Sequence, residues 1–351
     1  MTLPLRPTSF TKDEMLLHYA RLRQRPQVFK TLTGLTLADF DQLVTDLLPA
    51  FAAAERQRLS RPDRQRAIGA GRQFELAPRD QVLLTVIWLR LYPLHLVLGY
   101  LFGISHPTVG RVIGRVLPLL EAAGRATMRM PQPPKRQRRT LAELLTEFPD
   151  LAEVLTADEA AGPLGGAGGP ALEPPAAPPP TARVIVDTFE QRVQRPQDRT
   201  TADCHFSGKK KQHTLKSQVM VCGRTGQVVD SADSVPGPRA DLTVLDESGV
   251  LARVPEGVGI DGDLAYVGIA KLHPQGRTPR RKPRGTPRPA ADVVFNREFA
   301  RQRMVVEHTI RRMRCFQAIT QMDRHHRKHH SARVRAIGGL VNRQLSHGRP
   351  C

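Results

Sequence analysis

Acidic side chains occupy three places where the surrounding sequence would hold them on rigid elements. Asp187 ends the β-branched run 183–187, Asp261 and Asp263 follow a second apolar run, and Glu307 lies in a long helical segment. Carboxylates at the ends of neighbouring strands are the ligands from which two-metal phosphoryl-transfer sites are built. An Asp after a strand is also typical of a turn, and spacing alone favours the turn for any one of them.

Residues 291–315 are expected to form a long helix with an unusual face. At about 100° per residue, Asn296, Arg303, Glu307 and Arg314 fall within about 20° of one line. Apolar side chains flank this line: Phe299, Met304, Val306 and Ile310. Charged groups inside an apolar face cost free energy unless they are paired or bind a metal. The alternative is that Arg303 and Glu307 form a purely structural ion pair. Because Asn296 and Arg314 lie on the same line, we favour a functional role for this face of the helix.

The composition of the chain limits the class of partner. The 351 residues contain 53 Lys and Arg against 33 Asp and Glu, a formal net charge of +20. This surplus must lie largely on the surface, where it attracts polyanions, nucleic acid first and an anionic membrane second. With 40% hydrophobic residues the chain can bury a core. Its length predicts two or three domains at about 100–200 residues each.

Other classes are excluded by local patterns. The first ten residues lack the basic and apolar regions of a signal peptide. The most apolar stretch, 82–104, contains Arg90, Pro93 and His95, which favours a buried helical hairpin over a membrane span. The four cysteines form no CxxC pair, which argues against a zinc ribbon and is typical of a reducing cytoplasm. We therefore expect a cytoplasmic protein, nucleoid-associated if bacterial, with no membrane segment.

Periodicity divides the chain into a helical part and a mixed part. Residues 30–125 have helical spacing, and the helix 94–102 ends at Gly103 before a second helix that begins after Ser105. This pair is typical of a helix-turn-helix, with an ordinary helical hairpin as the alternative. Residues 131–140 are basic and Pro-rich, 141–155 predict a short helix, and 161–180 are nearly all Gly, Ala and Pro, as in a linker.

The mixed part follows the linker. The sequence predicts a hairpin from strands 217–222 and 227–230, a helix over 239–249, a strand over 257–261 and a basic loop over 274–290.

Short motifs follow one another in a fixed order through this part. They are Val186-Asp187 followed by Arg195-Pro196, the run 206–216, Pro236-Gly237 through Asp241-Leu242, Gly262-Asp263-Leu264-Ala265-Tyr266, Phe295-Asn296-Arg297, and Arg303 through Glu307-His308. Residues 82–120 add Trp88-Leu89-Arg90, the run 100–105, Thr108-Val109 and Arg111. In this order, residues 183–316 resemble the DDE transposases of the IS5/Harbinger-type group. Residues 82–120 resemble the helix-turn-helix that precedes their catalytic domain.

The resemblance implies a fold and its boundaries. It implies an α/β RNase H-like catalytic domain, with a mixed central sheet flanked by helices, preceded by an all-α helix-turn-helix domain. The helical region would cover 1–130, with the helix-turn-helix at about 78–120, and the basic, Pro/Gly/Ala-rich linker with its short helix would cover 131–180. The catalytic domain would cover 181–320, and a basic C-terminal tail would cover 321–351.

The resemblance also implies the site and its cofactor. Asp187 and Asp263 match the family's first and second Asp, and Glu307 matches its Glu. Asp263 is favoured over Asp261 because the family's Asp lies three residues before a Tyr, here Tyr266. Asp187, Asp263 and Glu307 would be catalytic and would hold two Mg²⁺ ions, with Mn²⁺ as a substitute. The supporting residues would be Asp241, Asn296, Arg303 and Arg314, the last standing where a Lys is usual.

The implied partner is double-stranded DNA, both the terminal repeats of an element and the target. A homo-oligomer on DNA is expected, because two ends must be brought together. Residues for DNA contact are His106, Thr108, Arg111 and Arg115 on the helix pair, and Lys209, Lys210, Lys211 and Lys216 near the site. A solvated edge strand is an equal interpretation of the four lysines.

The implied function is transposition of an insertion sequence by Mg²⁺-dependent phosphodiester cleavage and strand transfer. Ala300 stands where the family's signature has Tyr, and Ala240 stands where a His is usual. Two alternatives therefore stay open: a DNA-binding derivative that has lost cleavage, and a Mg²⁺-dependent nuclease without strand transfer.

One histidine cluster stands outside the motifs. His325, His326, His329 and His330 form two i, i+4 pairs, a spacing that could hold Zn²⁺. Basic neighbours would repel a cation, so we interpret this stretch as a basic segment at or near the DNA.

Overall fold

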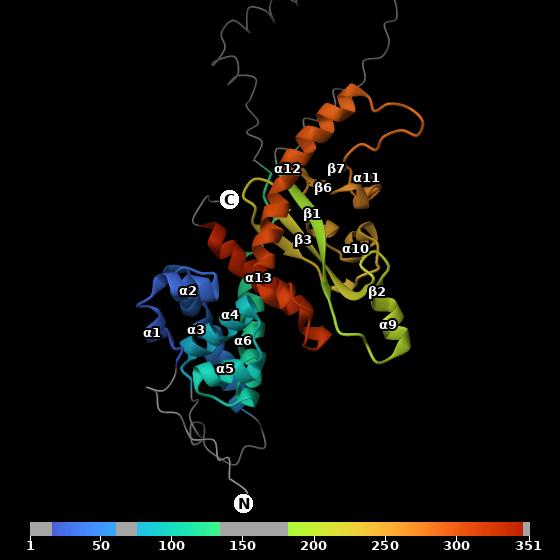
Figure 1. Cartoon of the computed structure of the whole chain (residues 1–351). Coiled ribbons are helices and arrows are strands. Elements are labelled where there is room, and N and C mark those ends of the chain that lie inside the picture. Colours follow the sequence, from blue (N-terminus) through green and yellow to red (C-terminus); the bar gives the residue numbers. More distant parts are fainter. Residues whose placement is uncertain (1–15, 61–75, 134–181, 347–351) are drawn as a thin grey trace, which may run out of the picture.

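The computed structural model describes residues 16–60, 76–133 and 182–346 (Figure 1). The predicted helix 141–155 and the linker 161–180 lie outside the described residues. The N-terminal part is helical, as expected, and the later part is a mixed sheet with flanking helices. The N-terminal helices are α1 (Tyr19–Leu22), α2 (Pro26–Thr33), α3 (Leu37–Leu59), α4 (Pro78–Leu91), α5 (His95–Phe102) and α6 (His106–Thr127).

Local sequence explains where these helices begin and end. Thr36 caps α3, because its hydroxyl accepts the Asp39 backbone N–H at 3.1 Å and the Asp39 carboxylate returns the interaction. Tyr92, with φ of 52°, ends α4 just before Pro93, and Gly103, with φ of 63°, ends α5. The predicted α5–α6 pair is confirmed, with 96° between the helices. No single helix among the described residues is long and apolar enough to cross a membrane. Among the described residues, only the bent α5–α6 pair, with its two helices taken together, has the length and apolar composition of a membrane span.

The sheet is mixed, and its two longest strands form its centre. The strand order is β2-β3-β1-β6-β7, with β4 and β5 also paired to β3. β1 runs antiparallel to β3 and parallel to β6. The predicted hairpin is present as β3 and β4, and Gly226, with φ of +75°, makes the turn between them. The strands are β1 (Ala182–Arg192), β2 (Phe206–Ser207), β3 (Gln212–Cys222), β4 (Val228–Ser231), β5 (Val235–Pro236), β6 (Val258–Asp261) and β7 (Gly276–Arg277).

Helices cover both faces of the sheet. Alternate side chains of β1 point to opposite faces, so Val184 and Val186 pack in one core with Leu245 of α10, while Ile185 and Phe189 pack in another core with α12 and α13. The helices of this part are α9 (Arg199–His205), α10 (Asp241–Glu247), α11 (Ile269–Leu272), α12 (Ala290–Arg314) and α13 (His330–Ser346). Short 3₁₀ turns are η2 (Leu251–Arg253), η3 (Leu264–Tyr266), η4 (Gln317–Ile319) and η5 (Arg327–His329).

Helix α13 joins the two parts of the molecule. Figure 1 shows it between the N-terminal helices and the sheet. It crosses α6 closely, since a Cβ on Gly339 would lie 2.2 Å from the Gly124 Cα. Its apolar residues belong to the core that also contains the N-terminal helices: Val334, Ala336, Ile337, Leu340 and Val341. The segment expected to be a basic tail therefore contains a buried helix. The arginines of this segment make it look like a basic tail in the sequence, although the apolar residues between them form a buried helix face.

Candidate active site

Asp187 lies in the middle of β1 and faces helix α12. Strand alternation places it on the same face as Ile185 and Phe189, which pack in the core shared with α12. Its Oδ1 accepts the backbone N–H of the next residue at 2.7 Å, and its Oδ2 lies 3.4 Å from Nη2 of Arg303. The expectation that Asp187 ends a strand is wrong, because β1 stays paired with β3 as far as Arg192.

The charge state of Asp187 depends on burial and on two other carboxylates. The pKa of Asp187 is raised to about 6, chiefly by burial and also by the negative charges of Asp263 and Asp241, while its backbone hydrogen bond and Arg303 act in the lowering direction. The pKa of the buried Tyr266 phenol is raised well above its usual value, first by burial and then by the same three carboxylates. Asp187, Asp241 and Asp263, whose charges act on one another and on Tyr266, are called the acidic centre below.

Asp261 is the last residue of β6 and Asp263 follows the strand, and the two have different roles in the fold. Asp263 is half-buried, and its Oδ1 accepts the Ala265 backbone N–H at 2.9 Å, which caps the turn η3. Asp261 is 1% exposed and lies between two guanidinium groups, with Nε of Arg183 and Nη2 of Arg277 each 2.9 Å from a carboxylate oxygen. Asp261 therefore links β1, β6 and β7, and only Asp263 has an accessible carboxylate.

The predicted polar line of α12 divides into two parts. Arg303 reaches Asp187, while Glu307 and Arg314 are exposed and line a groove beside β1. Asn296 does not join them, because its amide bonds the backbone of Arg280 in the basic loop. The expectation that all four polar residues lie within a buried face of α12 is therefore wrong in part, since Glu307 and Arg314 are exposed. Met304, expected to pack beside the line, is 49% exposed.

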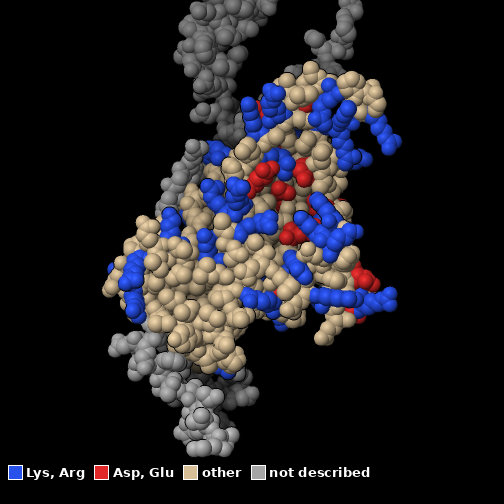
Figure 2. Space-filling model, in the orientation of Figure 1, with Lys and Arg blue, Asp and Glu red and all other residues tan. Residues whose placement is uncertain are grey.

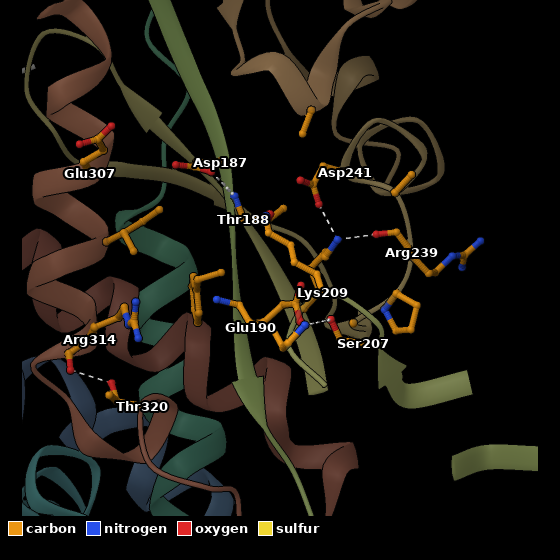
Figure 3. Close-up of a pocket in the computed structure, with 18 of the residues that line it drawn as sticks. Asp187, Thr188, Glu190, Ser207, Lys209, Arg239, Asp241, Glu307, Arg314 and Thr320 are labelled. Carbon is orange, nitrogen blue, oxygen red and sulfur yellow. Dashed lines mark hydrogen bonds and ion pairs between the residues drawn. The ribbon is translucent and has the colours of Figure 1, made fainter. Parts of the chain in front are cut away.

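A groove of about 1010 Å³ runs between β1, α12 and the turn before β3. Figure 3 shows Asp187 on β1 extending toward α12, which carries Glu307, with Asp241 on the other side of the strand. Lys209 and Lys210 line the groove from exposed positions, and Arg311 lines it from α12. Figure 2 shows the same arrangement at the surface, where acidic side chains are surrounded by Lys and Arg.

Lys216 is held inside the protein rather than presented to a partner. Its Nζ lies 2.6 Å from Oδ1 of Asp241 and also donates to the Arg239 carbonyl. Its side chain is 9% exposed. Lys211 lies in the exposed turn before β3, with a positive φ of 53°. Of the four lysines, three are therefore exposed and Lys216 is buried in an ion pair with Asp241. This pair joins residues 25 positions apart, so no local sequence pattern could predict it.

The helix pair presents only part of its predicted contact set. His106 and Arg111 are exposed on the first turns of α6, and Thr108 pairs with the Ser105 hydroxyl at 2.9 Å. Arg115 is half-buried, and burial lowers its pKa against the opposing effect of Glu55 on α3. Arg115 therefore turns toward α3, away from the exposed surface of α6.

Comparisons with known proteins agree with this division. Residues 186–342 match the model of the DDE superfamily endonucleases, and residues 74–126 match that of the helix-turn-helix of DDE superfamily endonucleases. The chain belongs to the DDE superfamily endonucleases. It is also 24% identical over 318 residues to a probable transposase for insertion sequence element IS702 from Microchaete diplosiphon, covering 91% of this chain and 94% of that protein. No solved structure gives a significant match.

The acidic residues of the endonuclease domain have the chemistry that a divalent metal requires. Carboxylate oxygens are the ligands that Mg²⁺ prefers. Burial and, to a smaller extent, the charges of Asp263 and Asp241 raise the pKa of Asp187, an effect that a bound cation would oppose. Among the described residues, no three His, Cys, Asp or Glu side chains stand close enough to form a complete metal site. These carboxylates are thus of the kind that a divalent ion would bind, and Nη2 of Arg303 lies 3.4 Å from Oδ2 of Asp187.

The histidine cluster of the endonuclease domain is a packing feature. His325 packs edge-on against Trp88 and Tyr92 and at a tilt against His95 of the helix-turn-helix part, at ring separations of 5.0–5.5 Å. Burial lowers the pKa of His325 to about 4. His330 is fully buried, with its two ring nitrogens paired to Ser234 at 2.8 Å and Gln191 at 2.7 Å. The interpretation of these two residues as basic groups at the DNA is therefore wrong, because burial keeps them neutral.

Proposed function

We propose that this chain is the transposase of an insertion sequence, with an RNase H-like catalytic domain that cuts and joins DNA. The observation that carries the proposal is the position of Asp187. It lies at the centre of β1, facing α12, in a groove shared with Glu307 and bordered by exposed basic residues. The antiparallel β1–β3 pair, the parallel β1–β6 pair and the long helix α12 over one face support the fold assignment.

Asp187, Asp263 and Glu307 would hold divalent metal, Mg²⁺ with Mn²⁺ as a substitute. When bound, the metal supplies activation of the attacking oxygen and stabilisation of the leaving 3′-oxygen of a phosphodiester. The protein's own residues do the rest. Lys209, Lys210 and Arg311 border the groove and would bind the phosphate backbone, which positions the scissile bond without reading sequence.

The helix-turn-helix would bring the element end to this groove. Its exposed His106 and Arg111 lie on the first turns of α6, where recognition helices contact base edges. Since two ends must be joined in one reaction, we propose that the protein acts as a homo-oligomer on DNA.

The test is an assay on labelled duplexes taken from the DNA that flanks the chain's own coding sequence, with Mg²⁺. The wild-type protein should nick at the element boundary and form joined products. Asp187→Ala and Glu307→Gln should abolish both products while binding to the duplex stays unchanged. Glu298→Gln is the matched control, because Glu298 lies exposed on α12 and pairs only with Arg301 at 3.6 Å among its described contacts.

Each alternative has its own outcome in this assay. Nicks without joined products indicate a nuclease that lacks strand transfer. Specific binding without nicks by the wild-type protein indicates a derivative that has lost cleavage. Nicking by Asp187→Ala at the wild-type rate contradicts the assignment of the site.

A further inference from the structure

The connection between β7 and α12 is a basic segment outside the groove. We call residues 278–289 the arm. From Arg280 onward every residue of the arm is exposed. It contains no acidic residue, and its basic residues are Arg280, Arg281, Lys282, Arg284 and Arg288. Figure 1 shows the arm projecting from the body beside the first turns of α12.

The base of the arm is fixed to α12 at Arg280. The Arg280 backbone N–H donates to Oδ1 of Asn296 at 2.8 Å, and Nδ2 of Asn296 donates to the Arg280 carbonyl at 3.0 Å. The Arg280 guanidinium pairs with Asp292 at 2.8 Å and lies 4.5 Å from the ring centre of Phe295. Arg280 is thus used to hold the arm, while Arg281, Arg284 and Arg288 extend beyond this base.

The tip of the arm is narrow. The chain turns at Arg284-Gly285, where Gly285 has φ of +75° and a Cβ would meet no atom within 4 Å. Pro283 and Pro287 flank the turn, so the backbone on each side is stiff and has no N–H to pair in a sheet. A slender backbone with arginines and no bulky side chain matches the minor groove, which is about 6 Å wide.

The arm stands within reach of a duplex held in the groove. Asn296, at its base, precedes Glu307 by 11 positions on one helix, which is about 16 Å at about 1.5 Å per residue. A distance of about 16 Å corresponds to about five base pairs at about 3.4 Å per step. The arm would therefore meet the same duplex within half a helical turn of the cleaved phosphate.

We propose that the arm inserts into the minor groove of A·T-rich duplex DNA beside the cleavage site. The narrow minor groove of A·T tracts has a strong negative potential that attracts arginine, and G·C pairs obstruct it with the guanine amino group. The proposal rests on the proposed function, since it takes duplex DNA to lie across the groove at Asp187 and Glu307.

The experiment compares three duplexes of equal length that lack element sequence: one with a central A·T tract, one with G·C pairs there, and one with inosine·C pairs. Inosine·C has the major groove of G·C but lacks the minor-groove amino group. Fluorescence anisotropy with the full-length protein should show A·T and inosine·C duplexes binding alike, and about ten-fold more tightly than G·C. Equal binding of all three, or inosine·C behaving as G·C, overturns the proposal.

A variant with Arg281, Arg284 and Arg288 all replaced by Gln should lose this preference. Its salt dependence should also weaken, by about one counterion for each phosphate that the variant no longer neutralises. The matched control replaces the exposed Arg21, Arg25 and Lys30 of the N-terminal helices with Gln, the same change in charge. Retention of the A·T preference by the arm variant, with circular dichroism showing that it is folded, overturns the proposal.

The cleavage assay separates this inference from the proposed function. If the wild-type protein shows no Mg²⁺-dependent cleavage but its A·T preference depends on the arm, the proposed function fails and the arm proposal stands. If cleavage depends on Asp187 while the arm variant binds all three duplexes as the wild type does, the arm proposal fails and the function stands.

Discussion

Nη2 of Arg303 lies 3.4 Å from Oδ2 of Asp187 and links helix α12 to the centre of β1. Both side chains are largely buried, at 14% and 20% exposure. The arginine therefore offsets the negative charge of the acidic centre and lowers the pKa of Asp187 against the effect of burial.

Loss of Arg303 should therefore destabilise the fold. Arg303→Met leaves the Asp187 carboxylate without its cation, and we expect the free energy of unfolding to fall by about 1–3 kcal/mol. Adding Asp187→Asn should restore most of that loss, because the uncompensated charge is removed. Urea unfolding followed by circular dichroism measures both, with Arg312→Met, exposed on the same helix, as the control. A double variant no more stable than Arg303→Met would contradict the pairing.

Replacement by Asn should reduce stability at Asp261 but cleavage at Asp263. Asp261→Asn leaves Arg183 and Arg277 without their shared carboxylate in a buried place, and we expect a loss of about 3–5 kcal/mol. Asp263→Asn keeps an oxygen that can cap η3, so its stability should stay within about 0.5 kcal/mol of the wild type. Under the proposed function, Asp263→Asn should nonetheless abolish cleavage. Thermal unfolding and the cleavage assay together check this, and equal stability losses in the two variants would refute the division of roles.

Local patterns predicted most of the elements that carry the site. Strand alternation, helical spacing and turn residues anticipated β1, β6, α10, α12 and the α5–α6 pair. Asp187 was misplaced at a strand end because four of the five residues after it in β1 are polar. Pairing with β3 keeps them extended, and that partner lies about 30 positions away in the sequence.

Long-range pairs of buried polar side chains could not be predicted in the same way. Asp261 pairs with Arg183 across 78 positions, and His330 meets Gln191 across 139. The residue type is the same whether a carboxylate or an imidazole is buried and paired or exposed and reactive. Only the fold therefore distinguishes the buried, paired Asp261 from the accessible Asp263. The roles of Asp187, Asp263 and Glu307 in catalysis stay predictions.

Arg111 and Arg115 should separate DNA contact from packing. Arg111 is exposed on α6, so Arg111→Ala should weaken binding to the element end and reduce the salt dependence by about one counterion, with no change in stability. Arg115 is half-buried toward α3, so Arg115→Ala should instead cost about 1–2 kcal/mol of stability. Anisotropy titrations at several salt concentrations, paired with urea unfolding, measure the two effects. A larger loss of DNA binding in Arg115→Ala than in Arg111→Ala would reverse the assignment.

His330 should make the fold sensitive to acid. Its pKa is lowered from 6.5 to about 3, chiefly by burial and then by the charge of Arg333, with Asp323 acting in the raising direction. Because the unfolded chain binds a proton below pH 6.5 and the folded chain does not, the contribution of His330 to stability is present above that pH. It is lost progressively as the pH falls toward about 3. Between pH 7.5 and 5.5 this residue should account for a loss of about 1.4 kcal/mol.

The measurement uses the single tryptophan, Trp88, which packs against His325 where the helix-turn-helix part meets the endonuclease domain. Urea unfolding is followed by its fluorescence at both pH values. His330→Gln can still bond Ser234 or Gln191 but cannot titrate, so it should be less stable at pH 7.5 and lose about 1.4 kcal/mol less on acidification. His326→Gln is the matched control for the loss of an imidazole, because His326 is exposed. If His330→Gln and the wild type lose the same free energy between the two pH values, the neutral, buried state of His330 is refuted.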